Sequence, residues 1–223
     1  MKRAPSLKGL FAAATLSLTG LLSAVPQANA LPWTEIGNAG DLVGTAQLTT
    51  GAGALTSISG SLSTGTDVDM FGIYISSPAA FSATTVGGAG FDTQLFLFNA
   101  VGIGIYANDD SVGTQSTLPA GHAKSPTTTG LYYLAISQYN RDPFSSGGLI
   151  FPSSPFNGVF GPTGPGGALP VNSWSGSGAT GTYTITLTGA SFSNVATTPE
   201  PSSLLLLGSG LATCVAWRRR QQV

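Results

Sequence analysis

Two pairs of aspartates are the residues of this chain best suited to bind a cation. Asp67 and Asp69 are two positions apart, so in an extended strand both side chains point the same way. Asp109 and Asp110 lie in a turn that could fold back over the edge of that strand. Calcium takes roughly six to eight oxygen ligands, which clustered Asp, Asn and backbone carbonyls supply. The sequence therefore predicts one of two roles for the four residues: a calcium site, or turns capped through backbone N–H groups.

Catalytic chemistry has weaker support in the sequence. His122 is the only histidine, it lies in the loop 119–124, and no G-x-S-x-G motif accompanies it. The two-carboxylate chemistry of glycosidases stays open in principle, although Glu35 is the only glutamate before the C-terminal tail. We therefore predict that the protein is not an enzyme.

Two aromatic residues are candidates for a ligand surface. Trp174 and Tyr139, together with a Phe-rich loop, could hold a polysaccharide or a protein partner. The alternative for Trp174 is burial beside the last strand of the domain. No cofactor other than calcium is suggested by the residue types present.

Charge and cysteine content narrow the function further. The 223-residue chain has a net charge of −1, but six of its eight basic residues lie in the two ends. Residues 31–198 keep two basic and eight acidic residues, a net charge of −6, which predicts no binding to nucleic acid. The single cysteine, Cys214, belongs to the C-terminal apolar run, so the central segment has no disulfide.

Residues 1–30 have the pattern of a secretory signal peptide. A basic flank and an apolar stretch over 9–25 precede an A-x-A site made by Ala28 and Ala30. We expect a signal peptidase to cleave after Ala30 and the protein to be exported across the inner membrane.

Residues 31–198 are predicted to form one all-β domain. In 182–188, Tyr183, Ile185 and Leu187 alternate with threonines, as in a half-buried antiparallel strand. The runs 94–99 and 131–137 are apolar on both faces, which is typical of central strands. Further strands are expected at 42–49, 55–62, 68–75, 80–85, 102–108 and 190–194. The whole pattern predicts a jelly-roll-like antiparallel β-sandwich, flanked by an N-terminal signal helix and a C-terminal hydrophobic helix.

A Gly/Pro-rich loop at 143–177 interrupts this pattern. Such a long connection is uncommon in a compact domain unless it has a function or is mobile. Its four phenylalanines could form a ligand surface, but we favour the interpretation that they pin the loop onto the sandwich. They are Phe144, Phe151, Phe156 and Phe160.

The C-terminal tail, 199–223, has three parts in a fixed order. Pro199, Glu200 and Pro201 come first, the apolar run 202–217 follows, and the basic end is Arg218, Arg219 and Arg220. A helix of this length spans about 24 Å and only just crosses a membrane, with the arginines on the cytoplasmic side. The tail resembles the PEP-CTERM sorting signal of Gram-negative bacteria. The resemblance implies transient membrane insertion, processing by an exosortase-type membrane protease, and association with exopolysaccharide and biofilm matrix.

The central segment carries a second resemblance. A D-x-D-x-F motif at 67–71, a D-x-x-L-x-L-F-like run from Asp92, the aspartate pair at 109–110 and a G-x-Y-Y motif at 130–133 occur in order. This set resembles the bacterial pre-peptidase C-terminal domain, in the variant found in PEP-CTERM proteins. The resemblance implies a small jelly-roll-like accessory module, and some relatives of this fold bind calcium.

These patterns together predict an exported protein of the cell surface or the extracellular matrix. Its expected role is structural, with exopolysaccharide or matrix proteins as possible neighbours. The alternative is a calcium-assisted module of the cell surface that binds a carbohydrate or a protein.

Overall fold

The structure is a computed structural model that describes residues 30–195. These residues belong to one compact unit, Gln27–Thr198. The signal peptide with Ala28, and the sorting tail with its expected hydrophobic helix, lie outside the described residues. Within the described part, the only helical element is the 3-10 turn η1 (Pro78–Ala80), and no helix is long and apolar enough to cross a membrane.

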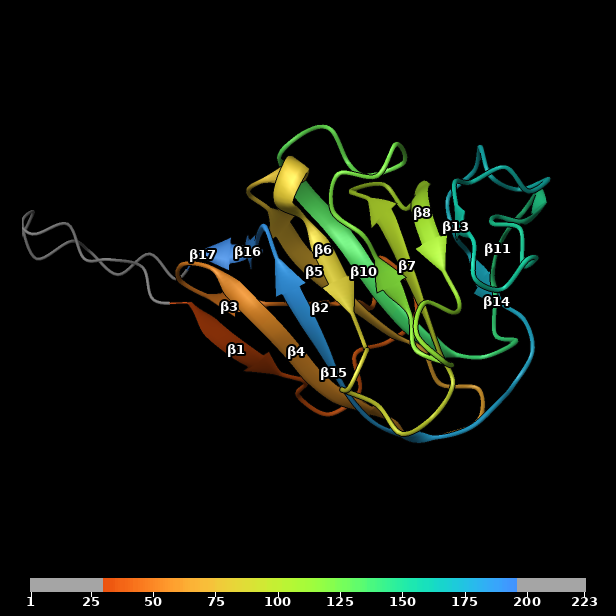
Figure 1. Ribbon diagram of the computed structural model, residues 1–223, viewed down its shortest axis with the longest axis horizontal. Coiled ribbons are helices and arrows are strands. Elements are labelled where there is room, and N and C mark those ends of the chain that lie inside the picture. Colours follow the sequence, from red (N-terminus) through yellow and green to blue (C-terminus); the bar gives the residue numbers. More distant parts are fainter. Residues whose placement is uncertain (1–29, 196–223) are drawn as a thin grey trace, which may run out of the picture. The chain divides into compact units, whose positions relative to one another are not determined.

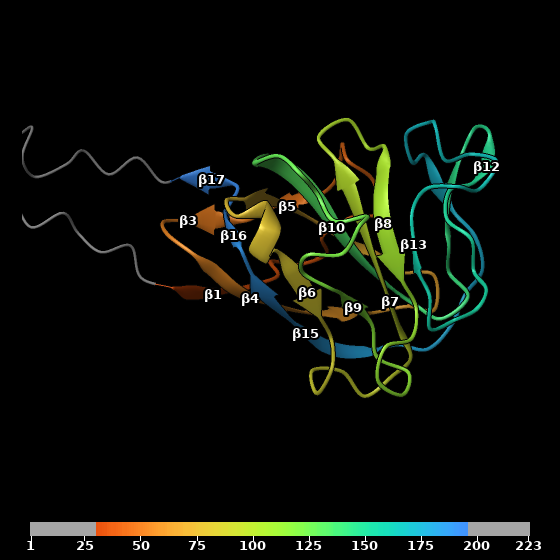
Figure 2. The same ribbon diagram turned by 45° about the horizontal axis from the view of Figure 1, so that its top comes forward.

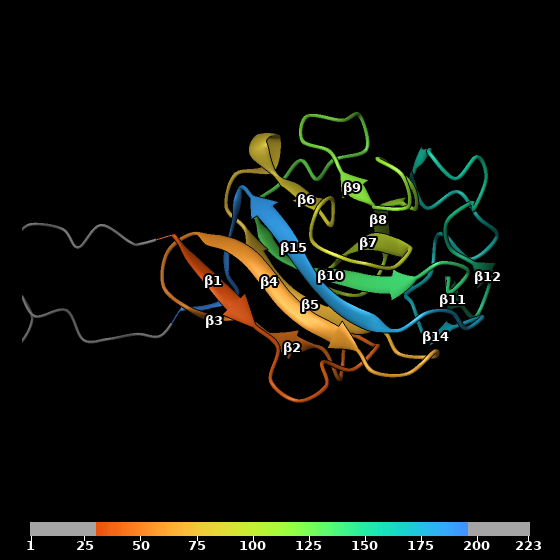
Figure 3. The same cartoon turned by 60° about the horizontal axis from the view of Figure 1, so that its bottom comes forward.

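A five-stranded sheet forms one layer of the domain. Figure 3 shows its strands β1, β4 and β15 side by side. In spatial order the sheet contains β1 (Leu31–Thr34), β4 (Leu55–Leu62), β15 (Gly181–Thr188), β6 (Ser82–Thr84) and β9 (Thr117–Leu118).

A seven-stranded sheet forms the second layer. Its centre is β10, which pairs antiparallel with β7 on one side and with β5 on the other. In spatial order the sheet contains β13 (Val159–Phe160), β8 (Gly104–Asn108), β7 (Thr93–Asn99), β10 (Gly130–Gln138), β5 (Asp69–Ile75) and β16 (Ala190–Phe192), with β2 (Gln47–Leu48) also paired to β5.

Two smaller sheets complete the described strands. One contains β12 (Gly148–Leu149), β11 (Pro143–Ser145) and β14 (Ser173–Trp174), and the other pairs β3 (Thr50–Gly51) with β17 (Asn194–Val195). The predicted all-β sandwich is confirmed, but the sheets are mixed, since β1–β4, β2–β5 and β3–β17 pair parallel. Parallel neighbours need a long connection, and residues 35–54 supply it between β1 and β4.

The main core lies between the two large sheets. Tyr183, Ile185 and Leu187 of β15 are buried, while the threonines between them are not, as the alternation predicts. Phe71 and Leu134 face them from the seven-stranded sheet and are fully buried. The alternating pattern therefore places one face of each long strand in this core.

A second core covers the outer face of the seven-stranded sheet. The segment 143–177 lies against this face and contains β11, β12, β13 and β14, so it is not structureless (Figures 1 and 2). Phe151 is 3% exposed, and its ring centroid lies 5.7 Å from that of Phe96 and 5.9 Å from that of Phe98. This packing explains why 94–99 is apolar on both faces. The predicted pinning role is confirmed for Phe151, but Phe156 is 49% exposed.

The expected strand at 42–49 is largely a turn. Only Gln47–Leu48 pairs with β5, while the backbone N–H of Thr45 donates to the carbonyl of Leu42 at 2.9 Å. The Thr45 hydroxyl also accepts from the Leu42 N–H, at 3.2 Å. These local hydrogen bonds compete with the sheet ladder, which is why the apolar residues here do not extend into a strand.

Candidate functional site

The four predicted calcium ligands lie in two different acidic groups. Asp67 and Asp69 stand at the start of β5 with Glu35 nearby, whereas Asp109 and Asp110 follow β8 and gather with Asp92. Strands β7 and β10 lie between β8 and β5, and three inter-strand steps span about 14 Å. The structure therefore does not bring the two pairs together, because the turn after β8 does not reach across the sheet.

Asp69 is the buried centre of the first group. Its side chain is fully buried at the first position of β5, and the Tyr183 hydroxyl donates to its Oδ2 at 2.6 Å. This bond joins β15 of one sheet to β5 of the other. Burial raises the pKa of Asp69 to about 8; the charges of Glu35 and Asp67 add to the rise, and the Tyr183 hydrogen bond opposes it.

Asp67 and Glu35 are held by local hydrogen bonds. Asp67 Oδ2 accepts from the Ser63 N–H at 2.6 Å and from the Ser63 hydroxyl at 2.8 Å, and Oδ1 accepts from the Val68 N–H. Glu35 accepts from backbone N–H groups of Ala39 and Ser61. Asp67 thus accepts from backbone N–H groups at this turn, which is the arrangement that the turn-capping alternative expects.

Asn38 and Gly60 complete the packing around this group. When the Asn38 amide nitrogen faces the aspartates, it donates to Asp67 Oδ1 at 3.3 Å and to Asp69 Oδ1 at 3.2 Å. A Cβ at position 60 would lie under 3.0 Å from the Tyr183 hydroxyl, so glycine there lets the tyrosine reach Asp69. A shallow hollow of about 430 Å³, lined by Glu35 and Tyr183 among others, opens beside the group.

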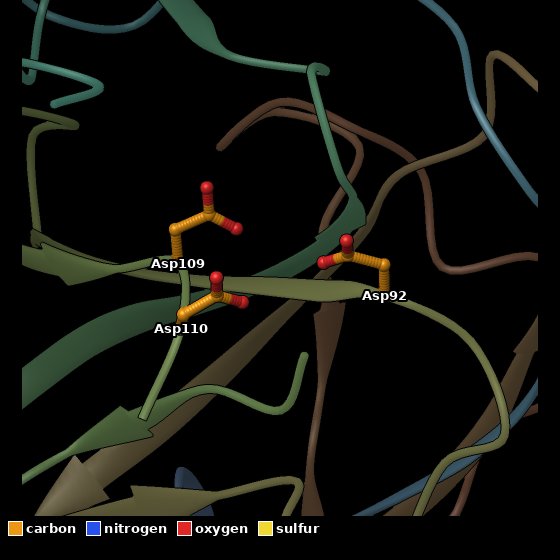
Figure 4. A group of neighbouring side chains, drawn as sticks. All are labelled: Asp92, Asp109 and Asp110. Carbon is orange, nitrogen blue, oxygen red and sulfur yellow. The ribbon is translucent and has the colours of Figure 1, made fainter. Parts of the chain in front are cut away.

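The second group lies at one end of the strands of the seven-stranded sheet. Asp92 precedes β7 and Asp109 follows β8. Because Leu95 pairs with Asn108 in this antiparallel hairpin, both aspartates lie at the same end of the paired strands. One carboxylate oxygen from each of Asp92, Asp109 and Asp110 lies within 4.8 Å of the others, and Figure 4 shows the three side chains close together. Asp92 was not among the predicted ligands; the hairpin pairing of its strand is the signal that would have revealed it.

Asp109 is the most buried member of the second group, at 6% exposure. Burial raises its pKa to about 7, and the negative charges of Asp110, Asp92 and Asp142 all act in the same direction. Burial also raises the pKa of Asp92, with a contribution from Asp110. Every charged neighbour that shifts the pKa of Asp109 is therefore acidic.

The two residues of the predicted ligand surface, Trp174 and Tyr139, lie in different surroundings. Trp174 packs inward: its indole N–H donates to the Asp41 carbonyl at 2.7 Å, and its ring meets that of Phe96 edge-on. Tyr139 is 43% exposed and pairs with the exposed Phe156, with ring centroids 5.7 Å apart. The exposed aromatic surface is consequently Tyr139 with Phe156, while Trp174 belongs to the second core.

The exposed aromatic pair is tied to the second acidic group through the backbone. The Tyr139 N–H donates to the Asp92 carbonyl at 3.1 Å, and the Asp110 N–H donates to the Phe156 carbonyl at 2.9 Å. The aromatic pair and the second acidic group therefore form one continuous region of the domain.

The predicted loop histidine lies in a turn. His122 Nδ1 accepts from the Lys124 N–H at 3.2 Å.

Comparison with known proteins identifies the tail. Residues 197–220 match the family model described as the PEP-CTERM protein-sorting motif. The match includes all six predicted sorting residues, which lie outside the described part of the structure. This motif indicates exosortase-targeted export to the cell surface, with processing at the membrane by exosortase. No curated protein matches the chain.

Proposed function

We propose that this protein is a non-catalytic structural component of the cell surface or the extracellular matrix, delivered there as an exosortase substrate. The observation that carries the proposal is the position of the sorting motif. It begins at residue 197, two residues after β17 ends at Val195, so the β-sandwich is the cargo of this sorting signal. In this proposal the sandwich is a jelly-roll-like domain of the pre-peptidase C-terminal type, and a signal peptidase removes residues 1–30.

The arrangement of the domain supports display from one end. Strand β1 begins and β17 ends at the same end of the domain, and the β11–β14 segment lies at the opposite end in all three views (Figures 1, 2 and 3). A domain delivered through its C-terminal end would thus present residues 143–177 farthest from the point of processing. The low content of charged residues, 8% of the chain, suits packing within a polysaccharide matrix.

Intact mass and location of the product test this proposal. In wild-type cells we expect a surface or extracellular product that lacks residues 1–30 and part or all of the tail. In cells without the exosortase, and for a Pro199→Ala/Glu200→Ala/Pro201→Ala variant, the tail should remain and the protein should stay with the membrane. An untrimmed 223-residue product in the cytosol would contradict the proposal. The matrix role requires, in addition, that the trimmed product co-purifies with exopolysaccharide.

A second candidate function is binding of a surface polysaccharide, and the Tyr139–Phe156 pair favours it. Two aromatic side chains in edge-to-face contact, each more than 40% exposed, offer apolar surface to a sugar ring. We expect a Tyr139→Ala/Phe156→Ala variant to be retained less on the producer's own exopolysaccharide. Tyr74→Ala is the matched control, because Tyr74 is 40% exposed elsewhere on the domain. Equal retention of both variants and the wild type would remove this candidate.

A further inference from the structure

Three carboxylates converge where β7 begins and β8 ends, and among the described residues no basic side chain pairs with them. The side chains of Asp92, Asp109 and Asp110 come from the two ends of the β7–β8 hairpin and lie close together (Figure 4). The Oδ1 atoms of all three are buried and have no hydrogen-bond partner among the described residues. An unpaired buried carboxylate oxygen is costly, so this arrangement needs a positive charge or protons to persist.

Asp109 gives the strongest indication of a ligand. Its side chain is 94% buried and its Oδ1 has no hydrogen-bond partner, while one of its carboxylate oxygens belongs to the group with Asp92 and Asp110. A surface cluster would relieve repulsion by turning its carboxylates outward into water, but a side chain this buried has no such freedom. The fold therefore holds Asp109 toward its acidic neighbours.

Backbone hydrogen bonds fix this geometry and leave the carboxylates free. The Asp92 carbonyl accepts from Tyr139, the Asp110 N–H donates to Phe156, and the Asn108 side-chain amide donates to the Asp110 carbonyl at 3.0 Å. None of these bonds uses a carboxylate oxygen of the group. The group is thus positioned in advance, and its oxygens remain available to a ligand.

We propose that Asp92, Asp109 and Asp110 form a binding site for one Ca²⁺ ion. Calcium–oxygen distances are about 2.3–2.6 Å, so oxygens on opposite sides of one ion lie up to about 5 Å apart, which matches a group spanning 4.8 Å. An all-oxygen set without histidine or cysteine favours a hard cation, and Mg²⁺ needs a tighter octahedron. Water and backbone carbonyls would supply the other positions. The site is separate from the Asp69 group and does not depend on the proposed matrix role.

Protons are the competing way to neutralise the group. Burial and its acidic neighbours raise the pKa of Asp109 to about 7, so a proton on this carboxylate competes with a cation near neutral pH. Above that pH Asp109 loses its proton, so cation binding should be tightest at alkaline pH. Binding should for this reason be tested at pH 8, where protons no longer compete strongly.

Calcium titration of the purified full-length protein, stripped with chelator and followed by calorimetry at pH 8, tests the site. We expect one Ca²⁺ per chain, and a loss of affinity of about tenfold or more in Asp92→Asn, Asp109→Asn and Asp110→Asn. Two matched controls should lose less affinity than these three variants, and Asp69→Asn should bind like the wild type. Asp142→Asn removes a nearby charge whose oxygen already accepts from Gln94, and Asp69→Asn alters the other acidic group.

Thermal melting adds a readout that a purely structural role would not give. With chelator, Asp109→Asn should melt at or above the wild-type midpoint, because it removes repulsion; with millimolar calcium, the wild type should melt higher. The proposal is overturned if the wild type neither binds calcium nor shifts its midpoint. It is also overturned if all three variants bind like the wild type, or if only Asp69→Asn loses binding. If Asp109→Asn fails to fold, the Asp92→Asn and Asp110→Asn variants test the calcium site, because these two residues are less buried.

Discussion

The two acidic groups of the domain are similar in charge but differ in whether the fold supplies hydrogen-bond donors to their carboxylates. Around Asp69, a tyrosine hydroxyl, a serine side chain and backbone N–H groups donate to the carboxylates. Around Asp109, the Oδ1 atoms of three aspartates have no donor among the described residues. The protein itself supplies hydrogen-bond donors to the first group, whereas the second group needs protons or a cation to offset its charge.

This difference shows that counting carboxylates does not locate a cation site. Both groups have raised pKa values through burial. What separates them is whether the fold supplies donors, since a buried acceptor with a partner is stable and one without is not. The following predictions test this contrast, beginning with the largest effect.

Removing the donor to Asp69 should give the largest loss of stability. Tyr183→Phe keeps the buried ring but leaves the Asp69 Oδ2 without its 2.6 Å partner, so the free energy of unfolding should fall by about 2 kcal/mol. Urea denaturation at pH 7 measures this. Tyr139→Phe is the control and should change stability by less than about 0.5 kcal/mol, because the Tyr139 side chain is largely exposed. Equal effects would mean that the Asp69 group is not held by this bond.

The pH dependence of stability should show both groups at once. Since the pKa values of Asp69 and Asp109 are raised to about 8 and about 7, the folded protein binds more protons than the unfolded chain above pH 4. Stability in chelator should accordingly fall as pH rises from 5 to 9, and melting scans at several pH values measure the fall. Asp69→Asn should reduce the slope up to about pH 8, whereas Asp109→Asn should reduce it only up to about pH 7, so that the fall between pH 7 and 8 depends on Asp69. A midpoint that is constant or rises over this range would contradict both assignments.

Substitutions of Asp67 and Asp110 should separate the effect of turn capping from that of charge repulsion. Asp67→Ala removes three hydrogen bonds at the turn before β5 and should cost about 1 kcal/mol in chelator. Asp110→Ala removes an unpartnered charge and should cost nothing or stabilise slightly under the same conditions. If the two variants lost stability equally, the contrast between the groups would not hold.

The long strands could be predicted from the sequence, and the short ones could not. In β15, β7 and β10, seven or more residues carry a clear alternating or doubly apolar pattern. Strand β1 has four residues, of which only Trp33 is buried, so no periodicity identifies it or its parallel pairing. The strands inside 143–177 have two or three residues each and are held by packing on a sheet that lies elsewhere in the sequence.

The candidate site was predictable only in part, for a similar reason. Asp109 and Asp110 are recognisable as a turn, and Asp92 could have been added from the pairing of β7 with β8, which are close in sequence. The partner of Asp69 could not be found this way, because Tyr183 lies 114 residues away on the other sheet. Local pattern identifies residues that can ligate or cap, but only the packing of the two sheets decides which donors reach them.

The smallest expected effect is the release of a fraction of a proton when calcium binds. A pKa of about 7 means that Asp109 is about half protonated at pH 7, so binding one ion there should displace about half a proton. Calorimetric titration at pH 7 in two buffers of different ionisation enthalpy measures this number. At pH 8 the release should drop to about a tenth of a proton, and Asp142→Asn should lower it at pH 7, because loss of that charge reduces the pKa of Asp109. Calcium binding without proton release at pH 7 would place the ion away from Asp109.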